Sequence, residues 1–369
     1  MGATSHGPAA QTEPAQSSAG DEPVDIFPAE HWAQQELPPR DDDDNDSSLG
    51  SDILSSTASL SASILEYRMI HGRTFHSDKT TDAQYWVPND DKQNESMDIN
   101  HHLLTLVLDG KLFRAPLDAE KIKKVIDIGT GTGLWAIDFA DQYPDVEVIG
   151  TDLSPIQPTW VPPNLRFEIE DMTLNWTYRP NDFDFVHMRY LFGSVENWTA
   201  LLRQAYRACK PGGWVESFEA STVMDSDDGS VKVGSPMTQW GKVFQAGGEK
   251  FGRTFRVVED GIQKKAFDEA GFVNVTVWDF KCPLTTWPAD RKLKEMGAFS
   301  QMALEQDIEG YVLFMWSEVM GWSTKEIHVY IAHLRNQIRD KSVHAFFRQR
   351  VVFGQKPEKQ AAGTGESDT

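Results

Sequence analysis

A short apolar run at residues 125–128 is followed at once by Gly129, Gly131 and Gly133, which alternate with threonines. Glycines let a chain turn sharply from strand to helix and bring backbone amides close to a ligand. Asp152 stands at the end of the next apolar run, where a carboxylate can accept hydrogen bonds from both hydroxyls of a ribose. The pattern predicts a nucleoside-binding site at the carboxyl edge of a parallel sheet.

The spacing of the glycines indicates which nucleoside this site binds. A dinucleotide fingerprint has its third glycine three positions after the second, where this chain has Leu134. A nicotinamide-dependent oxidoreductase is therefore disfavoured. Asp127, inside the first strand, is typical of methyltransferases, in which this acid organises the turn or receives the amino group of the methionine moiety. The motif favours S-adenosylmethionine as the cofactor.

Residues after the third and fourth predicted strands could complete the cofactor site. After the third strand, Asp171 could accept a hydrogen bond from the adenine amino group, and Met172 could cover the ring. His187 and Arg189 follow the fourth strand, where a ligand contact and a structural hydrogen bond are equally open. The predicted cofactor-binding residues are Asp127, Gly129, Thr130, Gly131, Gly133, Asp152, Leu153, Asp171, Met172 and Arg189.

Catalysis of methyl transfer makes few demands on protein side chains. The reaction is an in-line displacement, and the protein mainly aligns the partners and excludes water. A base is needed when the acceptor is a weakly acidic hydroxyl, and His187 and His76 are the candidates. His101 and His102 lack a third ligand for a metal and are expected to begin an amphipathic helix, so no metal site is predicted.

Several side chains, most of them aromatic, have two interpretations. Tyr67, Arg73, Tyr85 and Trp86 precede the sheet and could form a lid over the site; a packed helical cover is favoured for Tyr67, and the others stay open. Aromatic residues of the stretch 311–322 are usually core, although in this position they could wall a substrate pocket. They are Tyr311, Phe314, Trp316 and Trp322.

From residue 121 onward, apolar runs alternate with helical patterns, which predicts a Rossmann-like α/β fold with a mostly parallel sheet. We expect seven strands, the last of them antiparallel. Pro211-Gly212-Gly213 ends the helix before the fifth strand. The seven predicted strands span residues 125–128, 146–150, 165–169, 183–188, 214–218, 273–280 and 344–353, and a helical insertion is expected at about 289–341.

The segments outside this domain differ in composition. Residues 1–54 are rich in Ala, Ser, Pro and acids, and we predict a disordered acidic tail there. Residues 55–120 are predicted to form an N-terminal helical cover or lid, with helices over 59–70 and 99–108 and an irregular loop between them. The domain itself is expected at 121–357, followed by a second disordered tail at 358–369.

Charge and cysteine content exclude some classes of function. The formal net charge is −21, and residues 1–60 hold twelve acidic residues against one Arg. Such a surface repels phosphate backbones, so direct nucleic-acid binding is not expected. Two cysteines without pairing or metal-ligand spacing fit a reducing compartment. No apolar stretch is long enough for a membrane helix, and we expect an intracellular protein, cytoplasmic or nuclear.

Motifs across most of the chain resemble the fungal LaeA-like methyltransferase family. The resemblance covers residues 55–357 and departs from the family's common form between Phe75 and Pro88. It implies a Rossmann-like class I methyltransferase fold, S-adenosylmethionine as cofactor, and a role around fungal secondary metabolism. The matching segments are 127–139, 150–163, 183–195 and 210–216, Glu66-Tyr67-Arg68 with Gly72-Arg73 and His76, His101-His102, and Val352-Phe353-Gly354-Gln355-Lys356-Pro357.

The family divides in two, and so do the hypotheses for this chain. One is an enzyme that methylates oxygen or nitrogen of a small metabolite, whose mark would be a deep aromatic pocket built from the 289–341 insertion and the N-terminal cover. The other is a regulator that acts on or with nuclear proteins, with velvet-type proteins as possible partners, whose mark would be a shallow, open acidic cleft.

Overall fold

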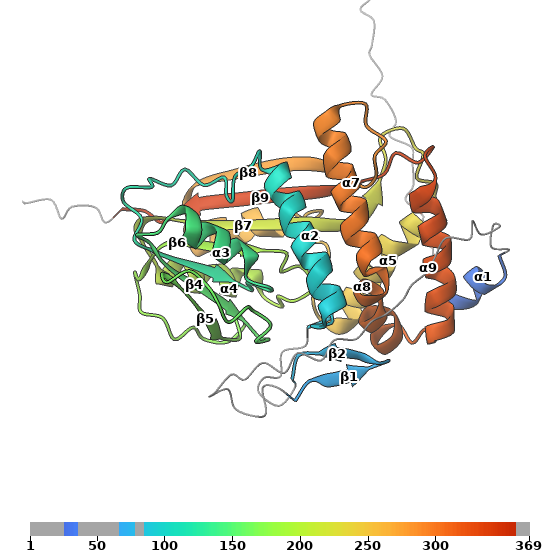
Figure 1. The fold of residues 1–369 in the computed structure, drawn as a ribbon, viewed down its shortest axis with the longest axis horizontal. Helices are drawn as coiled ribbons and strands as arrows, with labels where there is room; N and C mark the ends of the chain where they lie inside the picture. The colour runs from blue at the N-terminus through green and yellow to red at the C-terminus, as the bar shows by residue number, and fades with distance from the viewer. Residues whose placement is uncertain (1–25, 36–65, 78–84, 359–369) are drawn as a thin grey trace, which may run out of the picture.

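A seven-stranded sheet forms the framework of the molecule. The computed structural model describes residues 26–35, 66–77 and 85–358, and Figure 1 shows the sheet in one half and a group of helices in the other. The strands lie in the order β5-β4-β3-β6-β7-β9-β8. Their bounds are β3 Lys124–Ile128, β4 Glu147–Asp152, β5 Leu165–Ile169, β6 Phe183–Arg189, β7 Cys209–Asp225, β8 Val273–Pro283 and β9 Phe346–Gln355.

The strand directions confirm the predicted fold class. Strands β5, β4, β3, β6 and β7 are parallel, whereas β9, the last strand, is inserted antiparallel between β7 and β8. The chain moves outward from β3 to β4 and β5, and then returns to the other side of β3 as β6. Ligands of open α/β sheets bind at such a reversal of strand order, at the carboxyl ends of the strands.

Helices cover both faces of the sheet. Helix α3 (Leu134–Gln142) buries Trp135 and Phe139 against β3, β4 and β6 on one face. Helices α4 (Trp198–Ala208) and α6 (Ile262–Ala270) pack on the other face, where their apolar residues meet β6, β7 and β9. The β3, α3, β4, β5, β6 and α4 elements agree closely with the predicted alternation.

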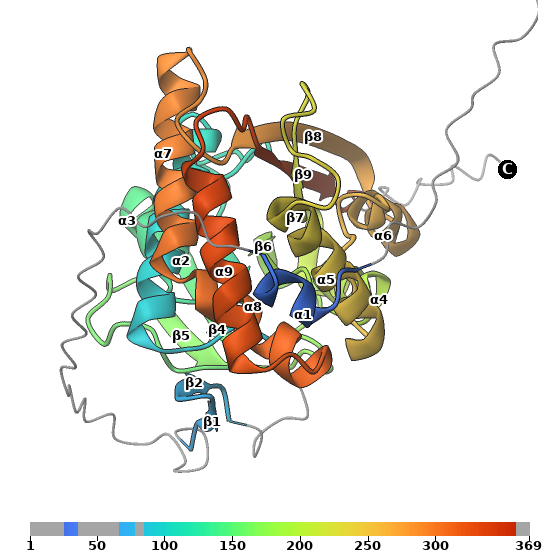
Figure 2. The ribbon, with the colours of Figure 1, turned by 90° about the vertical axis from the view of Figure 1, so that its right-hand side faces the viewer.

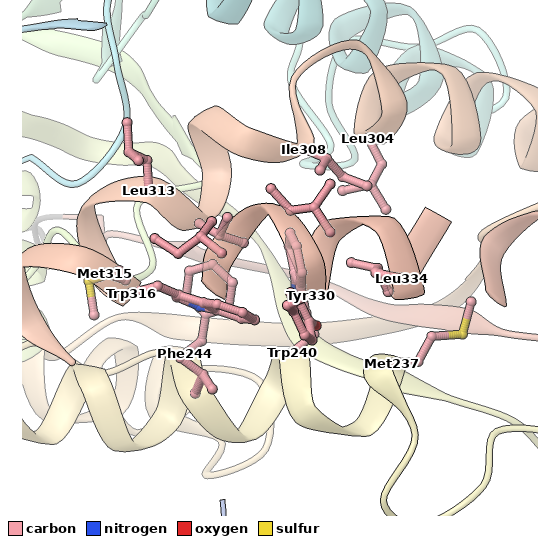
Figure 3. Close-up of a cluster of buried hydrophobic side chains, with 14 of the residues drawn as sticks. Met237, Trp240, Phe244, Leu304, Ile308, Leu313, Met315, Trp316, Tyr330 and Leu334 are labelled. Atoms are coloured by element: carbon pink, nitrogen blue, oxygen red, sulfur yellow. The ribbon is translucent and has the colours of Figure 1, made fainter. Parts of the chain in front are cut away.

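A second hydrophobic core lies among the helices beyond the sheet. Helix α5 (Pro236–Phe251) packs against α8 (Ile308–Phe314), the π-helix η1 (Met315–Val319) and α9 (Thr324–Arg339). Figure 3 shows Trp240 and Phe244 of α5 next to Trp316 and Tyr330. Helices α7 (Arg291–Gln306), α8, η1 and α9 make the predicted insertion helical, and α5 was not predicted.

The segment before the sheet differs from the prediction. Residues 68–75 form a hairpin of β1 (Arg68–Ile70) and β2 (Arg73–Phe75), not the end of a helix over 59–70, and Gly72 turns it at φ 83°. Helix α2 (Asp91–Val107) begins well before the predicted residue 99, because Asp90 caps it by accepting from the Gln93 amide. Figure 1 shows α2 between the sheet and α7.

A short helix lies within the predicted disordered tail. Helix α1 (Ala29–Ala33) buries Trp32, whose ring meets the edge of Tyr330 of α9 at 5.5 Å between centroids. Phe27 exchanges two backbone hydrogen bonds with the Gln239 side chain of α5 (3.0 and 3.2 Å). Figure 2 shows α1 beside α9 and α5. The prediction of disorder over 1–54 is therefore wrong for 26–35.

The rest of the predicted tails, residues 1–25, 36–54 and 359–369, lies outside the described residues, as do residues 55–65 of the predicted cover. The division into a cover at 55–120 and a domain at 121–357 stays a prediction. Within the described part of the chain, no helix combines the length and the apolar character needed to cross a bilayer. Cys209 and Cys282 are both buried free thiols.

Candidate active site

The glycine turn joins β3 to α3 and faces a pocket. Gly131 has φ 59°, and its amide donates a hydrogen bond to Asp152 Oδ2 at the tip of β4 (2.9 Å). Gly129, Thr130 and Gly131 line this pocket together with Asp152. The bend and the acid that the sequence predicted at one sheet edge are therefore adjacent in space.

Asp127 holds the glycine turn through hydrogen bonds and does not line the pocket. It is buried; its Oδ2 accepts from Thr130 Oγ1 and its Oδ1 bonds His187 Nδ1, both at 2.7 Å. With each oxygen engaged, Asp127 has the first of its two predicted roles, which is to hold the turn. It does not line the pocket, so direct cofactor contact by Asp127 is not supported.

His187 is a structural residue in this arrangement. Its ring stacks on Trp135 at 3.7 Å between centroids, and burial lowers its pKa, so the imidazole is neutral at pH 7. It lines neither pocket described below. His76 is also buried away from both pockets. Neither predicted base is placed to take a proton from an acceptor.

Gly133 serves packing more than binding. It stands in the left-handed region (φ 85°) at the start of α3, and a Cβ there would lie 2.4 Å from Cζ of Phe167 on β5. It does not line the pocket. The third glycine of the motif therefore lets α3 approach the sheet, while the first two form the pocket wall.

We call the cavity at this edge the cofactor pocket. It has a volume of about 150 Å³ and lies where the strand order reverses. Eight of the ten predicted cofactor residues line it: Gly129, Thr130, Gly131, Asp152, Leu153, Asp171, Met172 and Arg189. Asp127 and Gly133 support it from behind.

Asp152 is held towards the cofactor pocket by the backbone. Its Oδ1 accepts from the Ser154 amide (3.0 Å), and its Oδ2 from the Gly131 amide. Burial raises the pKa of Asp152 to about 6, while the two amide donors oppose that rise. A carboxylate oxygen can accept more than one hydrogen bond, so both oxygens can still receive ribose hydroxyls.

Arg189 brings a cation to the opposite side of the cofactor pocket. One of its terminal nitrogens donates to His101 Nδ1 (2.8 Å), and His101 Nε2 bonds Asp138 (2.9 Å). Burial lowers the pKa of His101, which fits a neutral ring that accepts from Arg189 and donates to Asp138. Arg189 is thus positioned by a neutral imidazole, which leaves its charge available to an anionic group in the pocket.

Helix α2 supplies a wall of the cofactor pocket that sequence reasoning missed. Gln93, Met97 and Asn100 line it, and the preceding Asn89 joins them. Buried Asn89 Oδ1 and Gln93 Oε1 have no hydrogen-bond partner among the described residues. The spacing of 93, 97 and 100 places these side chains on one helical face, which is the signal that could have revealed this wall.

A second pocket of about 120 Å³, which we call the inner pocket, adjoins the cofactor pocket. It is formed by residues of α2, β7, α5, α7 and β9, with Trp86 before α2. The wall between the pockets is shared, since the following residues line both: Trp86, Asn100, Tyr190, Phe192 and Tyr311.

The residues with two readings divide between pocket and core. Tyr85 and Trp86 line the cofactor pocket, and Trp86 is also part of the helical core. Tyr311 lines both pockets, whereas Phe314, Trp316 and Trp322 belong to the helical core. Tyr67 and Arg73 line neither pocket.

Comparisons with known proteins identify methyltransferases as relatives of this chain. A family profile described as "Methyltransferase domain" matches residues 99–277. "Methyltransferase pytC" of Aspergillus terreus is 38% identical over 307 residues, covering 83% of this chain and 93% of that protein. "Secondary metabolism regulator laeA" of Aspergillus fumigatus is 30% identical over 313 residues, covering 84% of this chain and 82% of that protein.

Among solved structures, phosphoethanolamine N-methyltransferase 2 of Haemonchus contortus, in complex with S-adenosyl-L-methionine, is similar at 16% identity with a TM-score of 0.41. The match covers 72% of this chain and 53% of that one. The curated relatives match this chain over most of their own length. In this chain, the glycine turn and the acid at the tip of β4 line one pocket. The chain belongs to the LaeA-like family of fungal S-adenosylmethionine-dependent methyltransferases.

Proposed function

We propose that this enzyme methylates an oxygen or nitrogen atom of a small molecule of fungal secondary metabolism, bound in the inner pocket. The observation that carries the proposal is the wall shared by the two pockets. An acceptor in the inner pocket would meet the cofactor across Tyr190 and Tyr311. The inner pocket draws on the N-terminal cover and the 289–341 insertion, which is the mark expected of a metabolite-modifying enzyme.

The residues of the cofactor pocket suit the parts of S-adenosylmethionine, which supplies an electrophilic methyl group when it is bound. Asp152 would accept hydrogen bonds from the ribose hydroxyls, and Asp171 and Met172 would hold the adenine. Arg189 would pair with the carboxylate of the methionine moiety. The unpartnered oxygens of Asn89 and Gln93 suit N–H donors of the cofactor.

The chain's contribution to the reaction is alignment and exclusion of water. Trp86 and Tyr311 would close the acceptor against the cofactor, since both line the two pockets. No aspartate, glutamate or histidine is found among the described residues that line the inner pocket. The acceptor atom would therefore keep its proton through the methyl transfer and lose it to bulk solvent when the pocket opens and the product leaves, which suits a neutral amine best and a phenol or an enol next.

The link to secondary metabolism rests on the relatives. "Probable methyltransferase tdiE" of Emericella nidulans is 31% identical over 72% of this chain, and other relatives are named as regulators of secondary metabolism. Those names favour a second candidate function. In that alternative the enzyme would act on or with a nuclear protein, with a velvet-type protein as partner.

One experiment separates the two candidates. The chain is incubated with S-adenosylmethionine carrying a labelled methyl group and with extract of the producing fungus. Label in the organic phase is expected if a metabolite is the acceptor, and label in precipitated protein would favour the regulator. The Gly131→Asp variant is the control, because a carboxylate at that position fills the cofactor pocket and should abolish both signals.

A further inference from the structure

The chemistry of the inner pocket indicates what it binds. Its apolar wall is built from aromatic and aliphatic side chains, including Trp240, Phe244 and Phe347. Its polar groups are amides and hydroxyls, and no charged side chain is found among the described residues that line it. A charged ligand would lose its hydration there without compensation.

An irregularity in the sheet brings three consecutive small residues of β7 to the wall of the inner pocket. Ala220 of β7 pairs with Gln349 of β9, and the register then shifts before Met224. Regular strand geometry points successive side chains to opposite faces, yet Ala220, Ser221 and Thr222 all line the inner pocket. A bulge of this kind re-aims side chains beside a binding site.

Two buried polar atoms in this wall have no hydrogen-bond partner among the described residues. They are Thr222 Oγ1 and Gln349 Oε1, on side chains that are 5% and 2% exposed. Buried polar atoms of native proteins are nearly always paired. Because both residues line the inner pocket, the missing partner is best supplied by a ligand.

Tyr190 fixes the direction of the Gln349 amide. Gln349 Nε2 donates to the Tyr190 hydroxyl oxygen (3.1 Å), which orients Oε1 away from it. The Asn100 side chain also hydrogen-bonds this hydroxyl. This bond lowers the pKa of Tyr190, as expected when the amide N–H of Asn100 donates to the hydroxyl oxygen. With its oxygen accepting from two amides, Tyr190 can direct its own hydrogen at an acceptor atom of a ligand at the shared wall.

We propose that the inner pocket binds an uncharged aromatic molecule of one or two rings that donates a hydrogen bond to Gln349 Oε1 and pairs with Thr222. This inference rests on the proposed function, because it assigns the substrate class of the same site. A cavity near 150 Å³ accommodates benzene, so the inner pocket of about 120 Å³ holds one ring, and a second ring would extend past the shared wall, where the inner pocket adjoins the cofactor pocket.

Three naphthalenes of similar size test the class of ligand. They are 2-naphthol, which is neutral with a donor; 2-methylnaphthalene, which is neutral without one; and 2-naphthoate, which is an anion. Each is titrated calorimetrically into the full chain saturated with S-adenosylhomocysteine. We expect 2-naphthol to bind about tenfold more tightly than 2-methylnaphthalene, as a buried acceptor gains its partner, and 2-naphthoate to bind most weakly. Binding of 2-naphthoate as tight as that of 2-naphthol, or of none of the three, overturns the inference.

Two variants test whether the preference for 2-naphthol depends on Gln349 Oε1 and Thr222 Oγ1. Gln349→Met and Thr222→Val keep the shape of the wall and remove the two unpartnered oxygens. Each should reduce the ratio of naphthol to methylnaphthalene affinity to about threefold or less. Gln355→Met makes the same change at the other end of β9, where Gln355 bonds Gly212 and Asn274, and should leave the ratio unchanged. An unchanged ratio in Gln349→Met also overturns the inference.

The failure of this inference can be told from that of the proposed function. S-adenosylhomocysteine is first titrated alone. If it does not bind, the cofactor pocket is wrongly assigned and the proposed function fails with it. If it binds and the naphthalenes show no preference for a neutral donor, the substrate class alone is wrong.

Discussion

Gly131 and Gly133 share a left-handed backbone conformation but differ in their neighbours. We therefore expect Gly131 to matter for cofactor binding and Gly133 for stability. A Cβ on Gly131 would lie 3.6 Å from Met97 Sδ at the pocket wall, an ordinary contact. On Gly133 it would lie within the Phe167 ring. Left-handed backbone costs a non-glycine residue about 1–2 kcal/mol at either position, and overpacking adds about 1–3 kcal/mol.

We therefore predict that one alanine variant mainly lowers cofactor affinity and that the other mainly lowers stability. Gly131→Ala should lower the affinity for S-adenosylhomocysteine and reduce stability only by the backbone cost. Gly133→Ala should lose more stability because the ring must move, and it should still bind the cofactor well below its melting temperature. Thermal unfolding and calorimetry measure the two effects, and equal losses of stability would contradict the assignment.

The pKa of Asp152 makes cofactor binding depend on pH. Burial raises that pKa to about 6, so the carboxyl is ionised above pH 6 and becomes protonated below it. The protonated form is the weaker acceptor for ribose hydroxyls. The affinity for S-adenosylhomocysteine should fall about tenfold between pH 7 and pH 5. Asp152→Asn should bind weakly and without this dependence, whereas Asp171→Asn should retain it.

Among individual residues, the sequence predicted best those that belong to a contiguous motif. The glycine turn and Asp152 were foreseen because strand topology alone brings a strand end and its neighbour together. Asn89 and Gln93 were missed because their importance depends on α2 lying across the site, which local sequence does not specify. The roles of His187 and Asp127 were open because a strand-end polar group can face either a ligand or the protein interior.

At the scale of elements, Arg73 joins the hairpin to two helices. Its guanidinium binds both oxygens of Asp90, which caps α2, and both oxygens of Asp307, which caps α8. The Asp307 side chain is fully buried, and that of Arg73 is 13% exposed. Breaking such a pair leaves an uncompensated buried charge, which costs about 3–5 kcal/mol.

Arg73→Ala should therefore lower the free energy of unfolding by about 3–5 kcal/mol and loosen the hairpin from α2 and α8. Arg348→Ala is the control, because Arg348 forms a half-exposed pair with Asp225 and should change stability by less than about 1 kcal/mol. Urea unfolding of both variants measures the difference. A similar small loss in both would show that Arg73 does not clamp these elements.

The elements that the sequence misassigned share a physical reason. The β1–β2 hairpin is too short to show an alternating pattern, and Gly72 reads equally well as a helix end or a hairpin turn. The first turns of α2 bury Gln93 and Ser96, so no apolar periodicity marks them. Helix α1 is hidden in an acidic context, and tertiary contacts of Trp32 stabilise it.

At the scale of the whole molecule, two fully buried glutamates couple stability to pH. Glu216 accepts from the amides of Arg114 and Ala115, and Glu219 from those of Leu191 and Phe192. Burial raises the pKa of Glu216 to about 7 and that of Glu219 to about 8, although the amides favour ionisation. Between the unfolded pKa and these values, the folded state binds more protons than the unfolded state.

Stability should therefore fall as the pH rises. Histidines whose pKa burial lowers oppose this fall only near pH 6.5, where an unfolded histidine is about half protonated, and they are neutral in both states above about pH 7.5. We expect a loss of about 2 kcal/mol between pH 6.5 and 8.5, measured by urea unfolding. Glu219→Gln should reduce the slope. A stability that rises over the same window would show that the amide donors outweigh burial.

The insertion of β9 between β7 and β8 has a kinetic consequence. Strands β7 and β8 lie on either side of β9 and do not pair with each other. Each of them pairs with β9 through residues that are far apart along the chain. Non-local pairing of this kind slows folding. Until β9 arrives, the long β7, which is mostly buried in the folded protein, presents an open edge to other molecules, which is a hazard for aggregation. Expression at low temperature or with chaperones should therefore raise the soluble yield, and variants that weaken β9 should precipitate before they lose cofactor affinity.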